Sequence, residues 1–250
     1  LWALKKDGKS FDWDSELPSH LQREWLKFHS TLGSLRDIRI PHYISQCTAT
    51  NVQVHIFADA SQLAYGACCY IRAESIEGVN VRLLTAKSKV VALSNSHSIA
   101  RLELCAARVL HQKVQQSLNI SATTICWTNS MTKPFVANRV AKIQQTPNIL
   151  CWKHVPGIDN PADDILRGLT PEKLLVCERW WHGPHWLSKT MEEWPQDPPS
   201  HQGTQKRRGW HHGLQQHQQS ASFATDCFHG IRFTTSFNGL LHIACASFIT

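Results

Sequence analysis

The sequence predicts an α/β fold in which helices pack on a mixed five-stranded β-sheet. Five segments between residues 52 and 155 consist of alternating or apolar residues that favour strands. The first three segments follow one another closely, whereas helical patterns separate the later ones. Sequential hairpins followed by strand–helix–strand connections are typical of a mixed sheet with helices on its faces.

Each element has its own signal in the sequence. The strands are expected at residues 52–57, 64–72, 79–88, 123–128 and 149–155. The linker 73–78 is short, so the second and third strands should form a hairpin. Apolar residues recur with helical spacing from 98 to 118. A second helix is expected in the connection 130–148, which exceeds the roughly 10–12 residues that a crossover between parallel strands needs.

Composition divides the chain into three regions. Residues 1–48 contain an acidic–aromatic turn and a helical pattern that should bury one face. The apolar residues of this pattern are Leu21, Trp25, Phe28 and Leu32. Residues 49–195 hold the strands and helices of the sheet. Residues 196–250 are rich in Gln, His, Gly and Ser, which predicts a mostly disordered tail with a short apolar end.

The overall composition narrows the partners and the compartment. The net charge of +7 and the pI of about 9.0 are compatible with a polyanionic partner such as nucleic acid. No segment reaches the ~18 consecutive apolar residues of a membrane helix, and the N-terminus lacks the apolar core of a signal peptide. The nine cysteines show no disulfide framework, so buried thiols in a reducing compartment are expected. The chain is therefore expected in the cytoplasm or nucleus, not secreted.

Three acidic residues are candidates for a catalytic site. Asp59 follows the first strand, Glu103 lies beside the apolar stripe of the long helix, and Asp163 follows the last strand. Acids so placed can converge on two divalent ions roughly 3.5–4 Å apart, which activate a water and stabilise the leaving oxygen when a phosphodiester is cut. Each acid also has a structural alternative, as a turn residue, a solvated charge or a helix cap.

A series of motifs runs through the chain in one order. They include Phe57-Ala-Asp-Ala-Ser61, Arg101-Leu-Glu-Leu-Cys105, Trp152-Lys-His-Val-Pro-Gly157, Asn160-Pro-Ala-Asp163 and Trp180-Trp-His-Gly-Pro-His-Trp-Leu187. Together they resemble the ribonuclease H-like region of Pao/BEL-type retrotransposon polyproteins, over residues 1–195. Residues 12–42 look like the connection that follows reverse transcriptase in this family, and residues 232–243 resemble the segment leading into its integrase.

The resemblance implies a ribonuclease H fold that cuts the RNA strand of an RNA–DNA hybrid. Reverse transcriptase and integrase parts of the same polyprotein would be its partners, without a membrane. Asp59 would bridge two Mg²⁺ (or Mn²⁺) ions, Glu103 would bind one, and Asp163 the other, with Asp164 as a neighbouring alternative. His154 would help to move protons or release product. Carboxylates supply the oxygen ligands that Mg²⁺ prefers.

The sequence also departs from the family pattern. Asn129 stands where the family has an aspartate; its amide oxygen can ligate a metal but lacks the negative charge. The stretch between Ser130 and Phe135 is shorter than in the family, which indicates an internal deletion. Two functions stay open: an impaired ribonuclease H, and a catalytically inactive remnant that acts at most as a nucleic-acid-binding or structural module.

Further residues have both a binding and a structural interpretation. The basic residues that could contact phosphates are Lys133, Arg139, Lys142 and Lys153. The same residues fit a solvated surface equally well. For Trp180, Trp181 and Trp186, packing is favoured over base stacking.

Overall fold

The computed structural model describes residues 16, 18–39, 49–91, 98–118, 122–130 and 149–196. These residues form a five-stranded sheet in the order β3-β2-β1-β4-β5. The strands are β1 (Asn51–Ala60), β2 (Ala64–Ser75), β3 (Gly78–Val90), β4 (Thr123–Thr128) and β5 (Ile149–His154). β2 is antiparallel to both β1 and β3, whereas β4 is parallel to both β1 and β5. This sheet confirms the predicted mixed α/β class.

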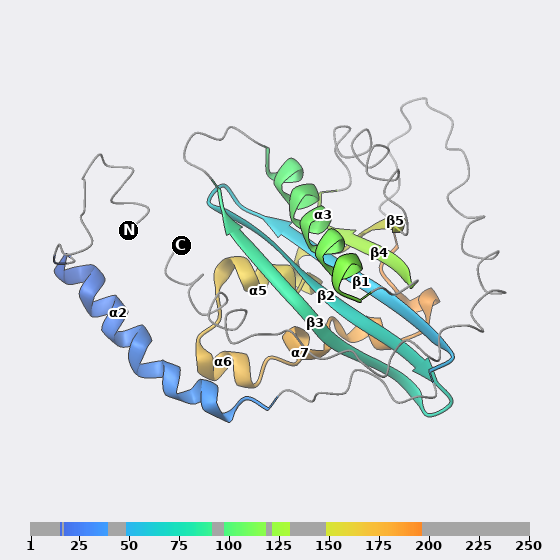
Figure 1. Cartoon of the computed structure of the whole chain (residues 1–250), viewed down its shortest axis with the longest axis horizontal. Helices are drawn as coiled ribbons and strands as arrows, with labels where there is room; N and C mark the ends of the chain where they lie inside the picture. Colours follow the sequence, from blue (N-terminus) through green and yellow to red (C-terminus); the bar gives the residue numbers. More distant parts are fainter. Residues whose placement is uncertain are drawn as a thin grey trace.

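The helices cover both faces of the sheet (Figure 1). On one face lies α3 (Ile99–Leu118), which matches the predicted helix, and its buried side chains form one core with the sheet. The second core contains residues of the other face and of the short helices α5, α6 and α7. The bounds of the short helical elements are α5 (Ala162–Arg167), α6 (Pro171–Leu175), α7 (Glu178–His182), η2 (Gly157–Asp159), η3 (His185–Ser188) and η4 (Met191–Glu193). The helix expected within 130–148 lies almost wholly outside the described residues.

β1 is the central strand and is longer than predicted. It continues past the expected end at Phe57 to Ala60, because β2 pairs with it along its whole length and β4 along much of it. Asp59 therefore lies inside a paired strand, opposite Gly66 of β2. Side chains alternate along the strand, so Ala58 joins the core beneath α3 while Phe57 joins the opposite core. By the same alternation, Asp59 faces the side of α5.

The second core is rich in aromatic rings. The ring centroids of Trp127 and Trp186 are 4.7 Å apart, and those of Trp127 and Trp194 are 5.8 Å apart. Trp180 is fully buried, and the indole N–H of Trp181 donates to the carbonyl oxygen of Leu174 at 2.8 Å. The tryptophans that were expected to pack are thus packing residues in the structure.

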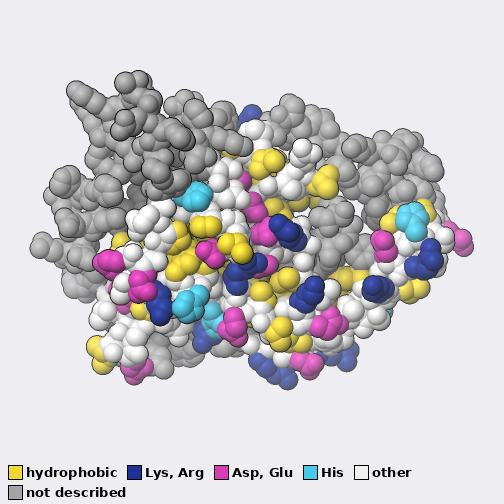
Figure 2. Space-filling model, turned by 180° about the vertical axis from the view of Figure 1, so that it is seen from behind, with side chains coloured by type: hydrophobic (Ala, Val, Ile, Leu, Met, Phe, Trp, Pro, Cys, Tyr) yellow, Lys and Arg dark blue, Asp and Glu magenta, His cyan; other side chains and the backbone are white. Residues whose placement is uncertain are grey.

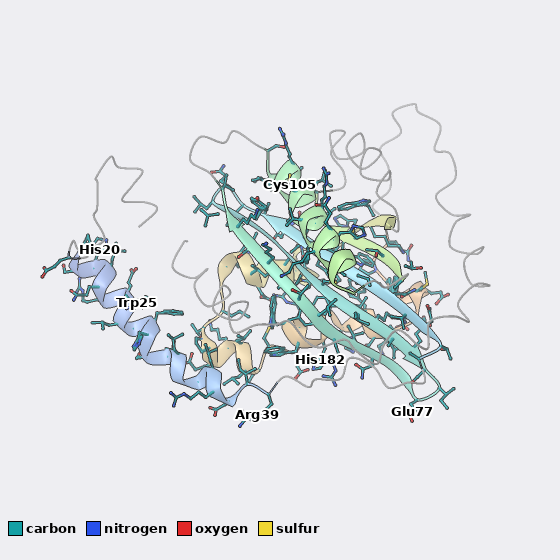
Figure 3. All side chains as sticks on the ribbon, viewed as in Figure 1. His20, Trp25, Arg39, Glu77, Cys105 and His182 are labelled. Atoms are coloured by element: carbon teal, nitrogen blue, oxygen red, sulfur yellow. The ribbon has the colours of Figure 1, made fainter. Side chains whose placement is uncertain are left out.

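The N-terminal helix differs from its prediction. In α2 (Ser19–Thr31) Phe28 is buried, and Leu21 and the following Leu32 are half-buried, whereas Trp25 is 43% exposed, so the expectation of a buried face is wrong at Trp25. The physical reason is its position: α2 lies beside the sheet rather than on it, and Trp25 stands clear of the core (Figure 3). The following turn η1 (Leu32–Asp37) does reach the second core, through Leu35.

Some predictions concern residues that the structure does not describe. The tail 196–250 lies outside the described residues except for Gln196, so its order stays a prediction. The boundaries at residues 48 and 195 also stay predictions. Among the described helices, none is both long enough and apolar enough to cross a membrane.

Candidate functional site

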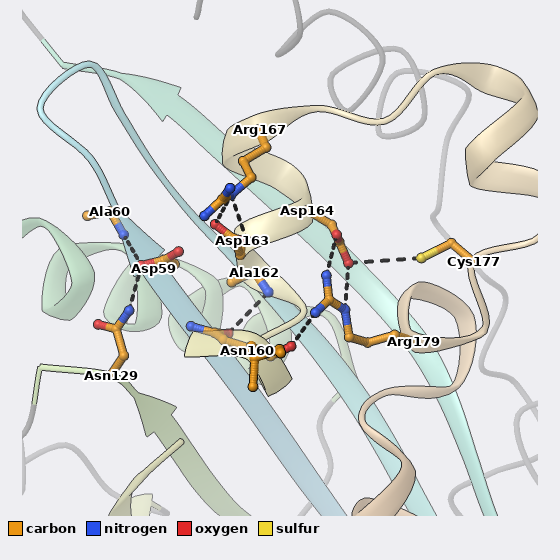
Figure 4. A network of polar contacts seen from close by, with 11 residues as sticks. Asp59, Ala60, Asn129, Asn160, Ala162, Asp163, Asp164, Arg167, Cys177 and Arg179 are labelled. Atoms are coloured by element: carbon orange, nitrogen blue, oxygen red, sulfur yellow. Dashed lines mark hydrogen bonds and ion pairs between the residues drawn. The ribbon is translucent and has the colours of Figure 1, made fainter. Parts of the chain in front are cut away.

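The ends of β1 and β4 bring two of the predicted site residues into contact. The parallel register pairs Ala58 with Thr128, so the next residues, Asp59 and Asn129, lie side by side. The side-chain amide of Asn129 donates to Oδ1 of Asp59 at 3.2 Å (Figure 4). The backbone N–H of Ala60 donates to the same oxygen at 2.9 Å. Because a carboxylate only accepts hydrogen bonds, the Asp59 carboxylate orients the Asn129 amide with its nitrogen inward.

Asp59 is buried, with 7% of its surface exposed. Its pKa is raised from 3.8 to about 6, first by burial and second by the negative charge of Asp163. The hydrogen bonds from Ala60 and Asn129 act in the opposite direction and lower the pKa. The net shift indicates a carboxylate held in a poorly solvated place beside a second acid, as is common at functional sites.

Glu103 approaches from the α3 side and is more buried than predicted. The sequence placed it at the margin of the buried stripe, but its side chain lies between α3 and the sheet with 1% of its surface exposed. Two hydroxyls from β4 and its end compensate the charge. Thr128 donates to Oε2, and Ser130 donates to Oε1 at 2.7 Å. A buried carboxylate with such donors avoids most of the cost of an unsatisfied polar group.

Ser130 connects the two acids indirectly. Its Oγ lies 2.7 Å from Oε1 of Glu103 and 3.2 Å from Oδ1 of Asn129. The backbone N–H of Ser130 donates to the Thr128 hydroxyl at 3.3 Å, which holds the end of the strand in this shape. The polar chain therefore runs from Asp59 through Asn129 and Ser130 to Glu103, around the end of β4.

The structure distinguishes the two late acids. Asp163 lies in the first turn of α5, and Arg167, one turn later, pairs with it at 2.8 Å. Asp164 is buried and forms an ion pair with Arg179 of α7, whose Nε and Nη2 lie 3.0 and 2.5 Å from its oxygens. Asp164 therefore fixes α5 to α7, and Asp163 is the acid whose charge acts on Asp59.

Asn160 and Gly66, which were not predicted as site residues, help to hold these acids in place. Asn160 is fully buried; it donates to the carbonyl oxygen of Ala58 at 3.1 Å and accepts from the N–H of Ala162 at 3.1 Å. Gly66 lies opposite Asp59, and a Cβ atom there would be 3.0 Å from Cγ2 of Ile165 in α5. The sequence showed Asn160 only as part of the motif Asn160-Pro-Ala-Asp163 and Gly66 only as a glycine within the second predicted strand, and neither side chain carries a group that suggests catalysis.

The remaining predicted residues lie at different places. His154 ends β5 and pairs in register with Thr128, one strand from the acids, and it is half-buried. Lys153 places its ammonium 5.7 Å from the ring centre of Trp127 and 5.3 Å from that of Trp194, a cation–π position. The other three basic residues predicted to contact phosphates, Lys133, Arg139 and Lys142, lie outside the described residues.

The donor atoms suit a hard divalent ion in kind, because three carboxylates and an amide oxygen are all oxygen ligands. In the described part of the chain, however, no three His, Cys, Asp or Glu side chains gather closely enough to hold one ion. Instead, donors from the chain itself reach each acid: Asn129 reaches Asp59, the two hydroxyls reach Glu103, and Arg167 reaches Asp163.

Comparison with known proteins places the chain in a family. Residues 4–130 match the family model described as the Pao retrotransposon-like RNaseH-like domain. A comparison with curated proteins finds no match. Among solved structures, the chain is similar to Ciona intestinalis endonuclease V, crystallised in complex with a 23mer DNA containing an inosine followed by a ribo-adenosine. The identity is 13% and the TM-score 0.26; the match covers 61% of this chain and 64%, less than two thirds, of the endonuclease chain. Because the family model spans just over half of the chain, the chain belongs to the family of Pao retrotransposon-like RNaseH-like domains.

Proposed function

We propose that this domain derives from a retrotransposon ribonuclease H that cuts the RNA strand of RNA–DNA hybrids, and that its own cleavage is impaired. The observation that carries the proposal is the contact between Asp59 and Asn129 at the ends of two adjacent parallel strands. It puts an amide beside the central acid, where the resemblance expects a second carboxylate. The substrate class is inferred from the family, and the slow reaction is inferred from the Asn129 amide.

Each site residue has a proposed role. Asp59, Glu103 and Asp163 would hold Mg²⁺ or Mn²⁺, which, when bound, supplies an activated water and stabilises the leaving oxygen. Burial of Asp59 and Glu103 keeps their surroundings poorly solvated, so their charges act strongly on the site. His154, at the end of the neighbouring strand, would move a proton near the site.

The impairment follows from charge. Two cations close together repel each other, and four negative ligands offset that repulsion better than three. Asn129 removes one charge, and its N–H group additionally occupies Oδ1 of Asp59. We therefore expect weak binding of the second ion and slow cleavage.

The proposal includes binding of the RNA–DNA hybrid, for which we expect only a modest electrostatic attraction. The chain carries a net charge of +7. On the face that carries α5 and α7, the described acidic and basic side chains are interspersed rather than sorted into one basic patch (Figure 2). Affinity for a polyanion should therefore be moderate and should fall as salt rises. Reverse transcriptase and integrase parts of one polyprotein are the proposed neighbours.

The deciding experiment compares four proteins in a cleavage assay on a labelled RNA–DNA hybrid with Mg²⁺ or Mn²⁺. They are the unmodified chain, Asn129→Asp, Asp59→Asn and the double variant. We expect slow cleavage by the unmodified chain, faster cleavage by Asn129→Asp, and none whenever Asp59 is replaced. Brisk cleavage by the unmodified chain that Asp59→Asn abolishes would contradict the impairment and keep the site.

The second candidate function is an inactive remnant that binds nucleic acid. It is favoured by the internal donors that engage all three acids in the structure. Hybrid binding measured by anisotropy, with no cleavage even by Asn129→Asp, would support it. Absence of both binding and cleavage in every variant would reject both functions.

A further inference from the structure

The acids of the site are satisfied by the chain itself, and the donors are concentrated in one tripeptide. Thr128 is the last residue of β4, Asn129 and Ser130 follow it, and all three contact an acid with their side chains. Two of the contacts go to Glu103 and one goes to Asp59. Arg167, by contrast, is 79% exposed, and such a surface ion pair contributes little. The end of β4 therefore supplies side-chain donors to both buried acids, in addition to the backbone N–H of Ala60 that reaches Asp59.

The tripeptide spans the thickness of the sheet. Thr128 is on the α3 side, where it donates to Glu103. Asn129 points to the other side and donates to Asp59. Ser130 closes the link, because its hydroxyl lies within hydrogen-bond distance of both Glu103 and Asn129. Asp59 and Glu103 thus approach the end of β4 from the two faces of the sheet, and side chains of the tripeptide contact both acids.

The amide at position 129 is what makes this link possible. Its nitrogen donates to the Asp59 carboxylate, while its oxygen shares the single proton of the Ser130 hydroxyl with Oε1 of Glu103, which is the nearer acceptor. An aspartate in the same place would put a second carboxylate about as close to Asp59 as the amide nitrogen is now, at 3.2 Å. Two adjacent carboxylates disfavour each other's charge strongly unless a cation lies nearby.

We propose that Asn129 and Ser130 form a hydrogen-bonded bridge that holds Asp59 and Glu103 in place without a divalent cation, so that the fold of this site is independent of metal. The proposal rests on the proposed function, because it concerns the same acids. It goes further in assigning the replaced residue a positive structural role: the bridge takes over the task of the ions in compensating the charge.

The test is thermal unfolding of the full chain in EDTA and in excess Mg²⁺. The Tm of the unmodified chain should change by less than about 1 °C, since a ligand that binds the folded state only weakly adds little to its stability. Asn129→Asp should melt about 5 °C lower in EDTA, because its added carboxylate is uncompensated. Mg²⁺ should raise the Tm of this variant most of the way back to that of the unmodified chain. Asn80→Asp, the same chemical change at an exposed position of β3, should show neither effect.

Ser130→Ala provides a second measurement that does not depend on how Asn129→Asp folds. It removes the hydroxyl bonded to the buried Glu103 and should lower the Tm by about 3–6 °C equally in EDTA and in Mg²⁺. An unchanged Tm for Ser130→Ala would overturn the bridge. So would a Tm of the unmodified chain that rises with Mg²⁺ as much as that of Asn129→Asp. Neither result bears on hybrid cleavage, and failure of the cleavage assay leaves these melting temperatures as they are.

Discussion

Asn160 donates its side-chain amide to the carbonyl oxygen of Ala58 at 3.1 Å, and this bond ties the start of α5 to the strand that carries Asp59. The same side chain accepts from the backbone N–H of Ala162 at 3.1 Å. The position of Asp163 relative to Asp59 thus depends on a buried amide that belongs to neither acid.

Asn160→Ala should lower the free energy of unfolding by about 2–4 kcal/mol, because it leaves two buried backbone groups without their partner. Urea unfolding at neutral pH measures the change. Asn51→Ala is the matched control: Asn51 also donates its amide, to Glu74 at 3.0 Å, but at the edge of the core. Its loss should cost less than about 1 kcal/mol. Equal costs for the two variants would show that the Asn160 contacts are not important for stability.

Gly66→Ala should destabilise the domain by about 1–3 kcal/mol through overpacking. The added Cβ would lie 3.0 Å from Cγ2 of Ile165 and 3.3 Å from the carbonyl oxygen of Lys87, so α5 has to move. In an Ile165→Ala background the same substitution should cost less, and a double-mutant cycle measures the difference. Gly33→Ala, where no atom lies within 4 Å, should be nearly neutral. A penalty that is unchanged in the Ile165→Ala background would place the strain elsewhere.

Arg72→Lys should loosen the segment that follows α7. The buried guanidinium donates to the carbonyl oxygens of Leu187 and Lys189, at 2.8 and 3.0 Å, and pairs with Glu74. Lysine lacks this planar fork of donors, so about 2–4 kcal/mol of stability should be lost. Hydrogen exchange should speed up in residues 187–194. The half-buried Arg82, replaced in the same way, should leave that segment protected.

Acid should destabilise the fold through His55. Burial, with the nearby charges of Arg72 and Lys153, lowers its pKa from 6.5 to about 3. The ring is held neutral: Nδ1 accepts from Trp127 at 3.1 Å, so Nε2 carries the proton that faces Gln53 at 3.3 Å.

The unfolded chain therefore takes up a proton on His55 below about pH 6.5 while the folded chain does not, and stability falls with pH. Between pH 7.5 and pH 5 the loss from this residue should be about 2 kcal/mol. Asp59 acts in the opposite sense, because its pKa is raised and the folded state gains its proton first, below about pH 6. His55→Phe isolates the histidine: its unfolding free energy should depend less on pH than that of the unmodified chain, even if it is lower at pH 7.5. An unchanged pH dependence would contradict the assignment.

Much of the fold was predictable because its signals are local. The apolar runs of β1, β2 and β3 and the periodicity of α3 gave elements close to those observed. The end of β1 was misplaced because it depends on pairing with β2 and β4, which a sequence pattern does not contain. The exposure of Trp25 in α2 was missed for a related reason: an apolar stripe indicates what can be buried, and the neighbours decide whether it is.

The candidate site shows the same division. Asp59, Glu103 and Asn129 were identified from motifs, but the depth of Glu103 depends on two hydroxyls across the helix–sheet interface. The choice between Asp163 and Asp164 needed Arg179, which reaches back from α7. Such partnerships between distant segments leave no local periodicity.

The aromatic core beneath the sheet determines how far this chain can be truncated from its C-terminal side. Trp194 is 2% exposed and packs against Trp127 and His55, although the family match already ends at residue 130. A recombinant piece that stopped at residue 130 would lose β5 and α5, leave one side of β4 unpaired and expose the indole of Trp127 to water. Exposed strand edges beside apolar surface favour aggregation. The shortest piece suitable for expression and crystallisation therefore extends through Trp194.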